Sequence, residues 1–304
     1  MRALAPGAVL VALLLLRPLG AQEATEVGQA TPRDTTSSVT KAAYPVDPEA
    51  ARTPFGPGEK LEYKVKLGIF AVGSAHMEVE GVDTVAGRRA YVAHLDIKGG
   101  IAFARVDDDL RSWFDVGTLA SRRFVQDIHE VKYKSHRFYE MLPDEQRWWR
   151  KDNDETGPML TSLPLDDIAF IYYIRTLDLE VGKTYTLNRY FKESGNPVII
   201  QVLRKDERKV PAGTFRTIVV KPIIRTKGLF SEGGNAEIHF SDDERRLVVY
   251  LRSEIPVVGS VTLHLRKIEE GLPLNPDSRK AAEARGVAGD PAVAAEGIGI
   301  PPGR

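Results

Sequence analysis

Alternation of apolar and polar residues with a period of two constrains the fold of this chain more than any other feature. In residues 61–69 every second side chain is apolar, and residues 75–79 repeat the pattern. Further alternating stretches lie at residues 91–97, 236–240, 247–251 and 261–265. Because successive side chains of a strand point to opposite faces, this pattern predicts strands with one apolar and one polar face. We therefore expect a mainly β protein with a large curved antiparallel sheet or half-barrel.

One segment departs from this period. Between Ser162 and Leu177 the apolar residues recur every three or four positions, which is the spacing of a helix. Serine, proline and two aspartates stand near its beginning, where free N–H groups favour hydrogen-bond acceptors and negative charge. We expect one central helix over residues 163–177.

The segments on the two sides of this helix resemble each other. The corresponding pairs are Gly58 and Gly182, Gly87 and Gly213, and Phe114 and Phe240, which are 124, 126 and 126 residues apart. A repeat of this length predicts two copies of a multi-stranded unit, over residues 54–160 and 178–268. The alternative is that the same turn and strand patterns recur by chance.

Both ends of the chain differ in composition from this body. Residues 1–21 combine a basic residue, a short apolar run and a small-residue cleavage site, which is typical of a signal peptide cut after Ala21. The apolar run is too short to span a membrane, so we expect a periplasmic or otherwise exported mature chain without a transmembrane span. Residues 22–53 are expected to be a flexible lead-in and residues 269–304 a disordered tail. A single domain would then cover residues 54–268.

Composition and motifs exclude several classes of function. The chain has no cysteine, which rules out disulfides, thiolate nucleophiles and cysteine-bound metals. Its 42 Lys and Arg balance its 42 Asp and Glu, which argues against a nucleic-acid partner. No phosphate-binding loop, dinucleotide fingerprint or nucleophile elbow occurs. We therefore expect no cofactor, no metal site and no catalytic residue.

Histidines and loop carboxylates remain as candidates for chemistry. Four histidines fall on the polar sides of strands and are expected to be solvated: His76, His94, His239 and His264. The carboxylates Asp109, Asp115 and Asp242 leave open an alternative function, a hydrolase acting on envelope glycan or lipid. Glycosidic chemistry would need two carboxylates that face each other across a cleft.

Several segments of the body carry the motifs of a known bacterial family. They are FGPGEKLEY at 55–63, LDDIAFIYYIR at 165–175, VPAGTF at 210–215, FSDDERR at 240–246 and GSV at 259–261. In order and spacing they resemble the envelope proteins grouped as domain of unknown function 3108. The resemblance implies an exported, β-rich protein of Gram-negative bacteria, and it brings no catalytic residues with it.

We expect a non-enzymatic protein that binds a hydrophobic small molecule or an envelope protein on its curved sheet. The candidate ligand-binding residues are Tyr63, Val65, Met77, Leu95, Trp148, Trp149, Phe240 and Leu263. The apolar ones among them could equally form a filled core. The two adjacent tryptophans should point to opposite faces, one buried and the other exposed. A third possibility is an assembly or structural factor that pairs through exposed sheet edges.

Overall fold

The computed structural model describes residues 44–101, 104–130, 133–225, 236–255 and 259–287, and it contains fourteen strands and two α-helices in these ranges. The first eight strands are β1 (Lys60–Leu67), β2 (Phe70–Val85), β3 (Arg88–Ile101), β4 (Ala104–Asp115), β5 (Ser121–Glu130), β6 (Tyr133–Leu142), β7 (Arg147–Arg150) and β8 (Glu155–Pro158). The other six are β9 (Thr184–Leu187), β10 (Val198–Val210), β11 (Gly213–Ile223), β12 (Glu237–Ser241), β13 (Val248–Ile255) and β14 (Gly259–Glu269). The predicted signal peptide and residues 22–43 lie outside the described residues.

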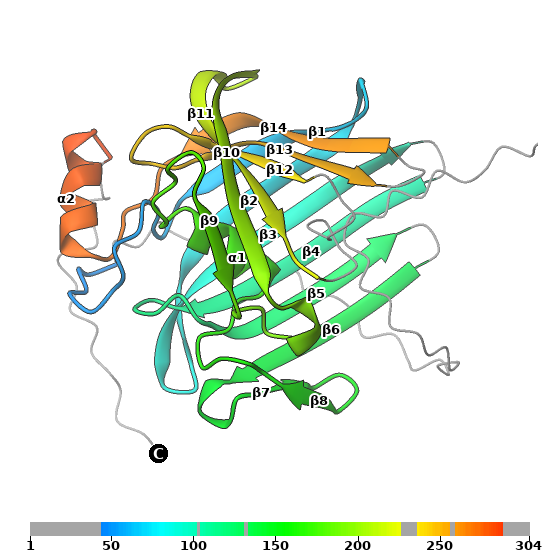
Figure 1. The fold of residues 1–304 in the computed structure, drawn as a ribbon, viewed down its shortest axis with the longest axis vertical. Coiled ribbons are helices and arrows are strands. Elements are labelled where there is room, and N and C mark those ends of the chain that lie inside the picture. The colour runs from blue at the N-terminus through cyan, green and yellow to red at the C-terminus, as the bar shows by residue number, and fades with distance from the viewer. Residues whose placement is uncertain (1–43, 102–103, 131–132, 226–235, 256–258, 288–304) are drawn as a thin grey trace, which may run out of the picture.

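All fourteen strands belong to one antiparallel sheet, in the order β8-β7-β6-β5-β4-β3-β2-β1-β14-β13-β12-β11-β10-β9. Strands β1 to β8 form one meander and strands β9 to β14 form another, and the pairing of β1 with β14 joins the two. The sheet curves strongly, so that β9 and β10 cross in front of the broad layer formed by β2 to β6 (Figure 1). The predicted mainly β fold with a large curved antiparallel sheet is confirmed.

Helix α1 (Asp167–Ile174) packs on the apolar face of the sheet, against β3 and β4. Six of its eight residues are buried. Apolar side chains surround the whole helix rather than one stripe of it, which is typical of a helix enclosed on all sides. The helix therefore fills part of the space inside the curved sheet.

The helix is shorter than the predicted range of 163–177. Leu165 forms a β-bridge with Tyr190, so the chain is still extended at that point. Asp166 is the N-cap, and its carboxylate accepts hydrogen bonds from the N–H groups of Ile168 and Ala169. Pairing of the preceding residues with a distant segment, which local spacing does not reveal, sets the beginning of the helix.

The two meanders share irregular features at corresponding places. Gly58 and Gly182, which precede β1 and β9, have positive φ angles of 84° and 91°. Their N–H groups donate to the carbonyl oxygens of Val79 and Val202, each over 2.8 Å, and a β-bulge follows each of these valines. Further bulges interrupt the β4–β5 and β12–β13 pairings. An internal duplication predicts such recurrence, because bulges and glycine turns are specific local geometries.

The folded body is longer than predicted at both ends. Residues 44–53, expected to belong to a flexible lead-in, pack against the body, with Ala50 and Thr53 buried. Helix α2 (Pro276–Ala284) lies in the range expected to be a disordered tail, and that expectation is wrong for residues 269–287. Asn275 caps the helix, and its side chain accepts from the N–H groups of Asp277 and Ser278. Because Ala282 is the one buried residue of α2, the helix lacks the apolar period that would have predicted it. Neither described helix is long and apolar enough to cross a membrane.

Candidate functional site

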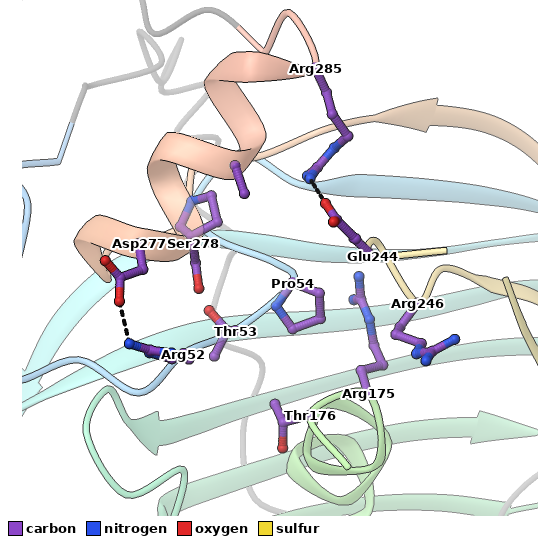
Figure 2. A pocket seen from close by; sticks show the side chains of 12 residues that line it. Arg52, Thr53, Pro54, Arg175, Thr176, Glu244, Arg246, Asp277, Ser278 and Arg285 are labelled. Atoms are coloured by element: carbon purple, nitrogen blue, oxygen red, sulfur yellow. Dashed lines mark hydrogen bonds and ion pairs between the residues drawn. The ribbon is translucent and has the colours of Figure 1, made fainter. Parts of the chain in front are cut away.

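A pocket of about 500 Å³ lies between α2, the end of α1 and the β12–β13 turn (Figure 2). Its charged lining residues are Arg52, Arg175, Arg246, Arg285, Glu244 and Asp277. The rest of its lining is small or apolar: Thr53, Pro54, Thr176, Pro273, Ser278 and Ala281. With four arginines and two acids, the pocket offers an excess of positive charge beside apolar surface.

The two ends of the body pack against each other to build this pocket. The N–H of Asp47 donates to the carbonyl oxygen of Leu274 over 2.9 Å, and the N–H of Leu272 donates to that of Pro57 over 3.2 Å. Gly56 permits the close approach, because a Cβ atom at this position would lie 2.0 Å from the carbonyl oxygen of Leu272. The segment before β1 thereby holds the segment that leads into α2.

Arg175, at the C-cap of α1, is the most buried cation of the pocket, with a fully buried side chain. Its guanidinium donates to both carboxylate oxygens of Glu59, over 2.6 and 2.8 Å. Its Cζ atom lies 5.1 Å from the ring centroid of Phe55 and 5.4 Å from that of Tyr172. This bidentate pair, with both rings beside the guanidinium, ties the end of α1 to the beginning of β1.

Arg246 lies 3.6 Å from the Asp242 carboxylate, whose side chain is 11% exposed, whereas Arg285 and Arg52 have far more exposed partners. Arg285 pairs with Glu244 over 3.2 Å, and the Glu244 side chain is 77% exposed (Figure 2). Arg52 pairs with Asp277, and both side chains are largely exposed. Exposed ion pairs contribute little stability, about 0–1 kcal/mol each. An entering anion can therefore replace these carboxylates at small cost.

Seven of the eight predicted ligand-binding residues lie in one contiguous buried core: Tyr63, Val65, Met77, Leu95, Trp148, Phe240 and Leu263. None of the seven is more than 7% exposed. The hydroxyl of Tyr63 donates to the carbonyl oxygen of Val248 over 3.0 Å, so its polar end is satisfied within the protein. Binding of a hydrophobic ligand among these residues stays a prediction.

The eighth residue, Trp149, lies on the opposite face of β7 from Trp148. It is partly exposed, its Nε1 donates to Asp154 over 2.8 Å, and the Lys151 Nζ lies 5.3 Å from its ring centroid. The predicted opposite orientation of the two tryptophans is confirmed.

Trp148 contacts a cluster of polar side chains beside the start of α1, which includes Lys192 and Asp167. Its ring centroid lies 5.0 Å from the Nζ of Lys192, which also donates to the Tyr139 hydroxyl over 3.0 Å. Burial lowers the pKa of Lys192 to about 8. Burial, followed by the charge of Asp166, raises the pKa of Asp167 to about 7, and Tyr190 donates to that carboxyl over 3.2 Å. The buried surroundings thus disfavour both charged forms.

Replacing Asp167 by asparagine is expected to stabilise the protein in a pH-dependent way. A carboxyl whose pKa rises from 3.8 to about 7 on folding contributes its stability below pH 4 and loses it as the pH rises through 7. Asparagine cannot ionise, and its oxygen can still accept from Tyr190. We expect Asp167→Asn to gain on the order of 2 kcal/mol over the parent at pH 8 and nothing at pH 4. Urea unfolding at both pH values measures this, and a difference that does not change with pH would contradict it.

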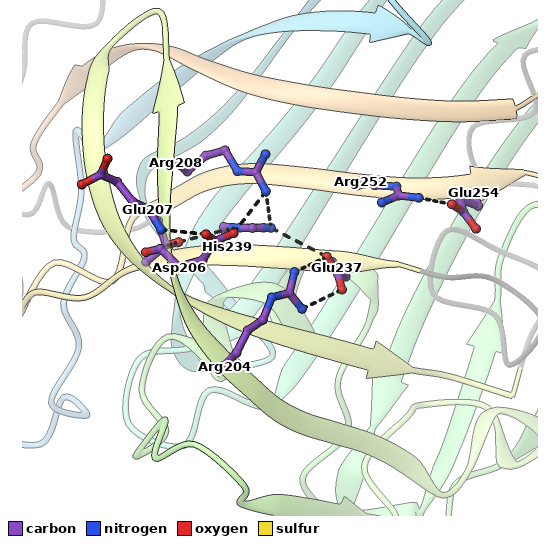
Figure 3. A network of polar contacts seen from close by, with 9 residues as sticks. Arg204, Asp206, Glu207, Arg208, Glu237, His239, Arg252 and Glu254 are labelled. Carbon is purple, nitrogen blue, oxygen red and sulfur yellow. Dashed lines mark hydrogen bonds and ion pairs between the residues drawn. The ribbon is translucent and has the colours of Figure 1, made fainter.

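The expectation that the four histidines on polar faces are solvated is wrong for His239 and His94, which are buried. Asp206 and Arg208, both from β10, lie close to the ring of His239, which is fully buried (Figure 3). Its nitrogens lie 3.8 Å from carboxylate oxygens of Asp206 and Glu237 and 3.3 Å from an Arg208 nitrogen. Burial and then the charge of Arg208 lower the pKa of His239 to about 4, so the ring is neutral near pH 7.

His94 is the second buried histidine, and it belongs to a cluster with the spacing of metal ligands. One atom each of His94, Asp96 and Asp109 lie within 4.8 Å of one another. However, the ring nitrogens of His94 already lie 3.2 Å from Glu80 and 2.7 Å from Asp109. Burial lowers the pKa of His94, but these hydrogen bonds outweigh it and raise the pKa to about 9. His94 thus belongs to a network of ion pairs with Glu80 and Asp109.

The three carboxylates considered for hydrolysis each pair with a cation. The pairs are Asp109 with His94, Asp115 with Arg122, and Asp242 with Lys205. Burial raises the pKa of Asp109, but the contacts with His94 and Arg111 together outweigh it and lower the pKa, and Lys205 lowers the pKa of Asp242. A general acid in a glycosidase needs a raised pKa, which neither of these two has.

The sequence matches a known family over most of the folded body. The family model "Protein of unknown function (DUF3108)" matches residues 62–266. The chain belongs to this family. The match includes Arg175, Glu244 and Arg246 of the pocket, while Arg52, Asp277 and Arg285 lie outside it. No curated protein matches the DUF3108 chain.

Three solved structures are similar to this DUF3108 protein at low sequence identity. A β-barrel-like protein of domain of unknown function DUF1849 from Brucella abortus has a TM-score of 0.47 and 10% identity, over 71% of this chain and 99% of that one. A "putative lipoprotein" from Parabacteroides distasonis has a TM-score of 0.33 and 13% identity, over 72% and 99%. A "putative exported protein with YmcC-like fold" from Bacteroides fragilis has a TM-score of 0.32 and 12% identity, over 73% and 100%.

Proposed function

We propose that this DUF3108 protein is an exported, non-enzymatic binding protein whose ligand is a small molecule with an acidic group. The observation that carries the proposal is the pocket of about 500 Å³ with its four arginines. Small-molecule sites commonly measure about 300–1,000 Å³ and combine apolar walls with a few polar groups that fix orientation. The pocket fits this description in size, while its lining, half of which is charged, favours a ligand with an acidic group.

The chemistry of the lining favours a carboxylate, phosphate or sulfonate group on the ligand. A guanidinium binds such planar or tetrahedral anions through two parallel N–H bonds. Arg52, Arg246 and Arg285 are the arginines left for the anion, because Arg175 is committed to Glu59. The walls of proline, alanine and threonine can contact an apolar part of the same molecule. This proposed ligand is amphipathic and lies in the arginine pocket, whereas the ligand expected from sequence is a hydrophobic molecule or an envelope protein on the curved sheet.

The carboxylates of the protein also favour a binding function over hydrolysis. Among the described residues, Asp166 and Asp167 are the carboxyls with a raised pKa, to about 6 and about 7, mainly through burial. They are adjacent in sequence at the beginning of α1, and Asp166 is occupied as a helix cap with Ser112 and two N–H groups. They therefore lack the facing arrangement of a hydrolase pair. Export is supported by the signal-peptide pattern of residues 1–21.

Titration with the aromatic sulfonate 1-anilinonaphthalene-8-sulfonate tests the pocket. We expect one saturable site, and we expect the double variant Arg246→Ala/Arg285→Ala to bind at least about tenfold more weakly, since two charge-assisted hydrogen-bond donors are lost. Arg204→Ala is the matched control, because this arginine is half-exposed and pairs with Glu237 outside the pocket. Equal affinity of the double variant and the control would contradict the assignment.

A further inference from the structure

The turn between β1 and β2 exposes two large apolar side chains. Ile69 is 84% exposed and Phe70 is 69% exposed. Every other large apolar residue that is exposed in the described structure has an exposed fraction of 47% or less. Single exposed apolar residues are ordinary, but two adjacent ones at the tip of a hairpin need an explanation.

The backbone forms a tight turn at this tip. Pairing of β1 with β2 continues to Leu67 and Phe70, so Gly68 and Ile69 are the two residues of a tight turn. Gly68 has a φ of 56°, and its N–H donates to the carbonyl oxygen of Ser260 over 2.9 Å. Polar residues and glycine are usual in such turns, because the side chains there face water. At this tip, isoleucine and phenylalanine occupy the exposed places instead.

Basic side chains surround the strand ends that lead to this turn. Lys64 and Lys66 lie on the polar face of β1, and within the described residues neither has an ion-pair partner. The cross-strand row that begins at Lys64 runs through Ser74, Lys98, Asp107 and His129 to Lys134 on β6. Lys98 pairs with Asp96 and Asp107, whereas Lys134 is exposed and, among the described residues, also lacks a partner. The row therefore carries a net positive charge.

Burial and the charges of these lysines lower the pKa of a neighbouring histidine, His264. His264 lies opposite Lys64 in the β1–β14 pairing. Burial lowers the pKa of His264 to about 4, and the charges of Lys66, Arg208 and Lys64 lower it further in the same direction. With His264 neutral near pH 7, the positive charge near the tip comes from lysines and arginine, and it persists over the physiological pH range.

We propose that the β1–β2 tip docks this protein on a membrane that contains anionic lipids, with Ile69 and Phe70 entering the headgroup region. Apolar side chains next to unpaired lysines are the combination that favours peripheral binding to such a surface. A protein partner fits less well, because a stable protein interface buries about 800 Å² on each side, far more than two side chains offer. The tip lies at the opposite end of β1 from Glu59 and the arginine pocket, so the pocket stays accessible (Figure 1).

Co-sedimentation of the mature chain with phospholipid vesicles tests this proposal. We expect binding to vesicles of phosphatidylethanolamine and phosphatidylglycerol. Binding should be at least about tenfold weaker to phosphatidylcholine vesicles, and also weaker in about 0.5 M salt, because salt screens the attraction between the lysines and the anionic lipids. The variant Ile69→Ser/Phe70→Ser should lose at least tenfold in vesicle affinity. Val181→Ser/Leu160→Ser is the matched control, because these residues are 47% and 46% exposed elsewhere, and it should bind as the parent does.

A second measurement places the tip in the lipid. In the variant Phe70→Trp, the fluorescence of the new tryptophan should shift to shorter wavelength when anionic vesicles are added, while Leu160→Trp should show no shift. The proposal is overturned if the parent does not bind anionic vesicles, if the serine variant binds them as well as the parent, or if the Phe70→Trp emission does not change. Anilinonaphthalene sulfonate binding in the arginine pocket is measured without lipid, so the two proposals fail or stand separately.

Discussion

Replacing Arg175 by methionine is expected to lower the free energy of unfolding by about 3–5 kcal/mol. The substitution leaves the Glu59 carboxylate 3% exposed and without its bidentate partner. A buried charge without a counter-ion is among the costliest defects in a protein interior, because the solvation lost on folding is no longer compensated. The contacts of the guanidinium with the rings of Phe55 and Tyr172 are lost at the same time. Urea unfolding at pH 7 measures the difference.

A double variant separates the loss of the ion pair from the loss of packing. Adding Glu59→Gln to Arg175→Met removes the stranded charge, and we expect it to recover more than half of the lost stability. If the double variant is no more stable than Arg175→Met alone, then the damage comes from packing, and the electrostatic explanation fails.

The second large effect is expected at Gly56. In Gly56→Ala the added methyl group would lie 2.0 Å from the carbonyl oxygen and 2.3 Å from the carbonyl carbon of Leu272, both main-chain atoms that cannot rotate away. We expect the segment from Leu272 to α2 to detach from the segment before β1, with a loss of about 3 kcal/mol. Hydrogen exchange should show faster exchange in α2, while the strands of the sheet keep their protection.

Two further glycines serve as comparisons for this result. A Cβ atom on Gly271 would lie 2.2 Å from the carbonyl oxygen of Gly56, so Gly271→Ala should release α2 in the same way. Gly286 follows α2 with a φ of 90°, and nothing lies within 4 Å of a Cβ atom there. Gly286→Ala should therefore cost about 1 kcal/mol of local strain and leave α2 in place. Release of α2 by Gly286→Ala but not by Gly56→Ala would contradict this description of the contact.

The sheet could be predicted from sequence because its signal is local. Leu61, Tyr63 and Val65 alternate with lysine and glutamate, and this alternation survives folding since one face of each strand is buried and the other is not. The central helix was also predicted from its spacing, but the residue at which it begins was not. Leu165 has a helical place in the spacing, and its bridge to Tyr190, 25 residues later, keeps it extended.

The pocket could not be predicted, because its lining comes from four distant parts of the chain. Arg52 and Arg285 lie in segments whose composition indicates flexibility, and their order depends on the close approach of Gly56 and Leu272. One signal for α2 was present: Asn275 followed by Pro276 and Asp277 is a typical helix start. The burial of His239 was hidden for a similar reason, since residues of β10 cover a face that alternation alone marks as polar.

Native mass spectrometry of the protein, purified from its own cell envelope without detergent, tests the central claim most directly. We predict a species heavier than residues 22–304 by one small acidic molecule. The added mass should be absent from Arg246→Ala/Arg285→Ala and present in Arg204→Ala. A mass equal to the mature chain alone, in every preparation of the parent protein, would contradict the proposed binding function.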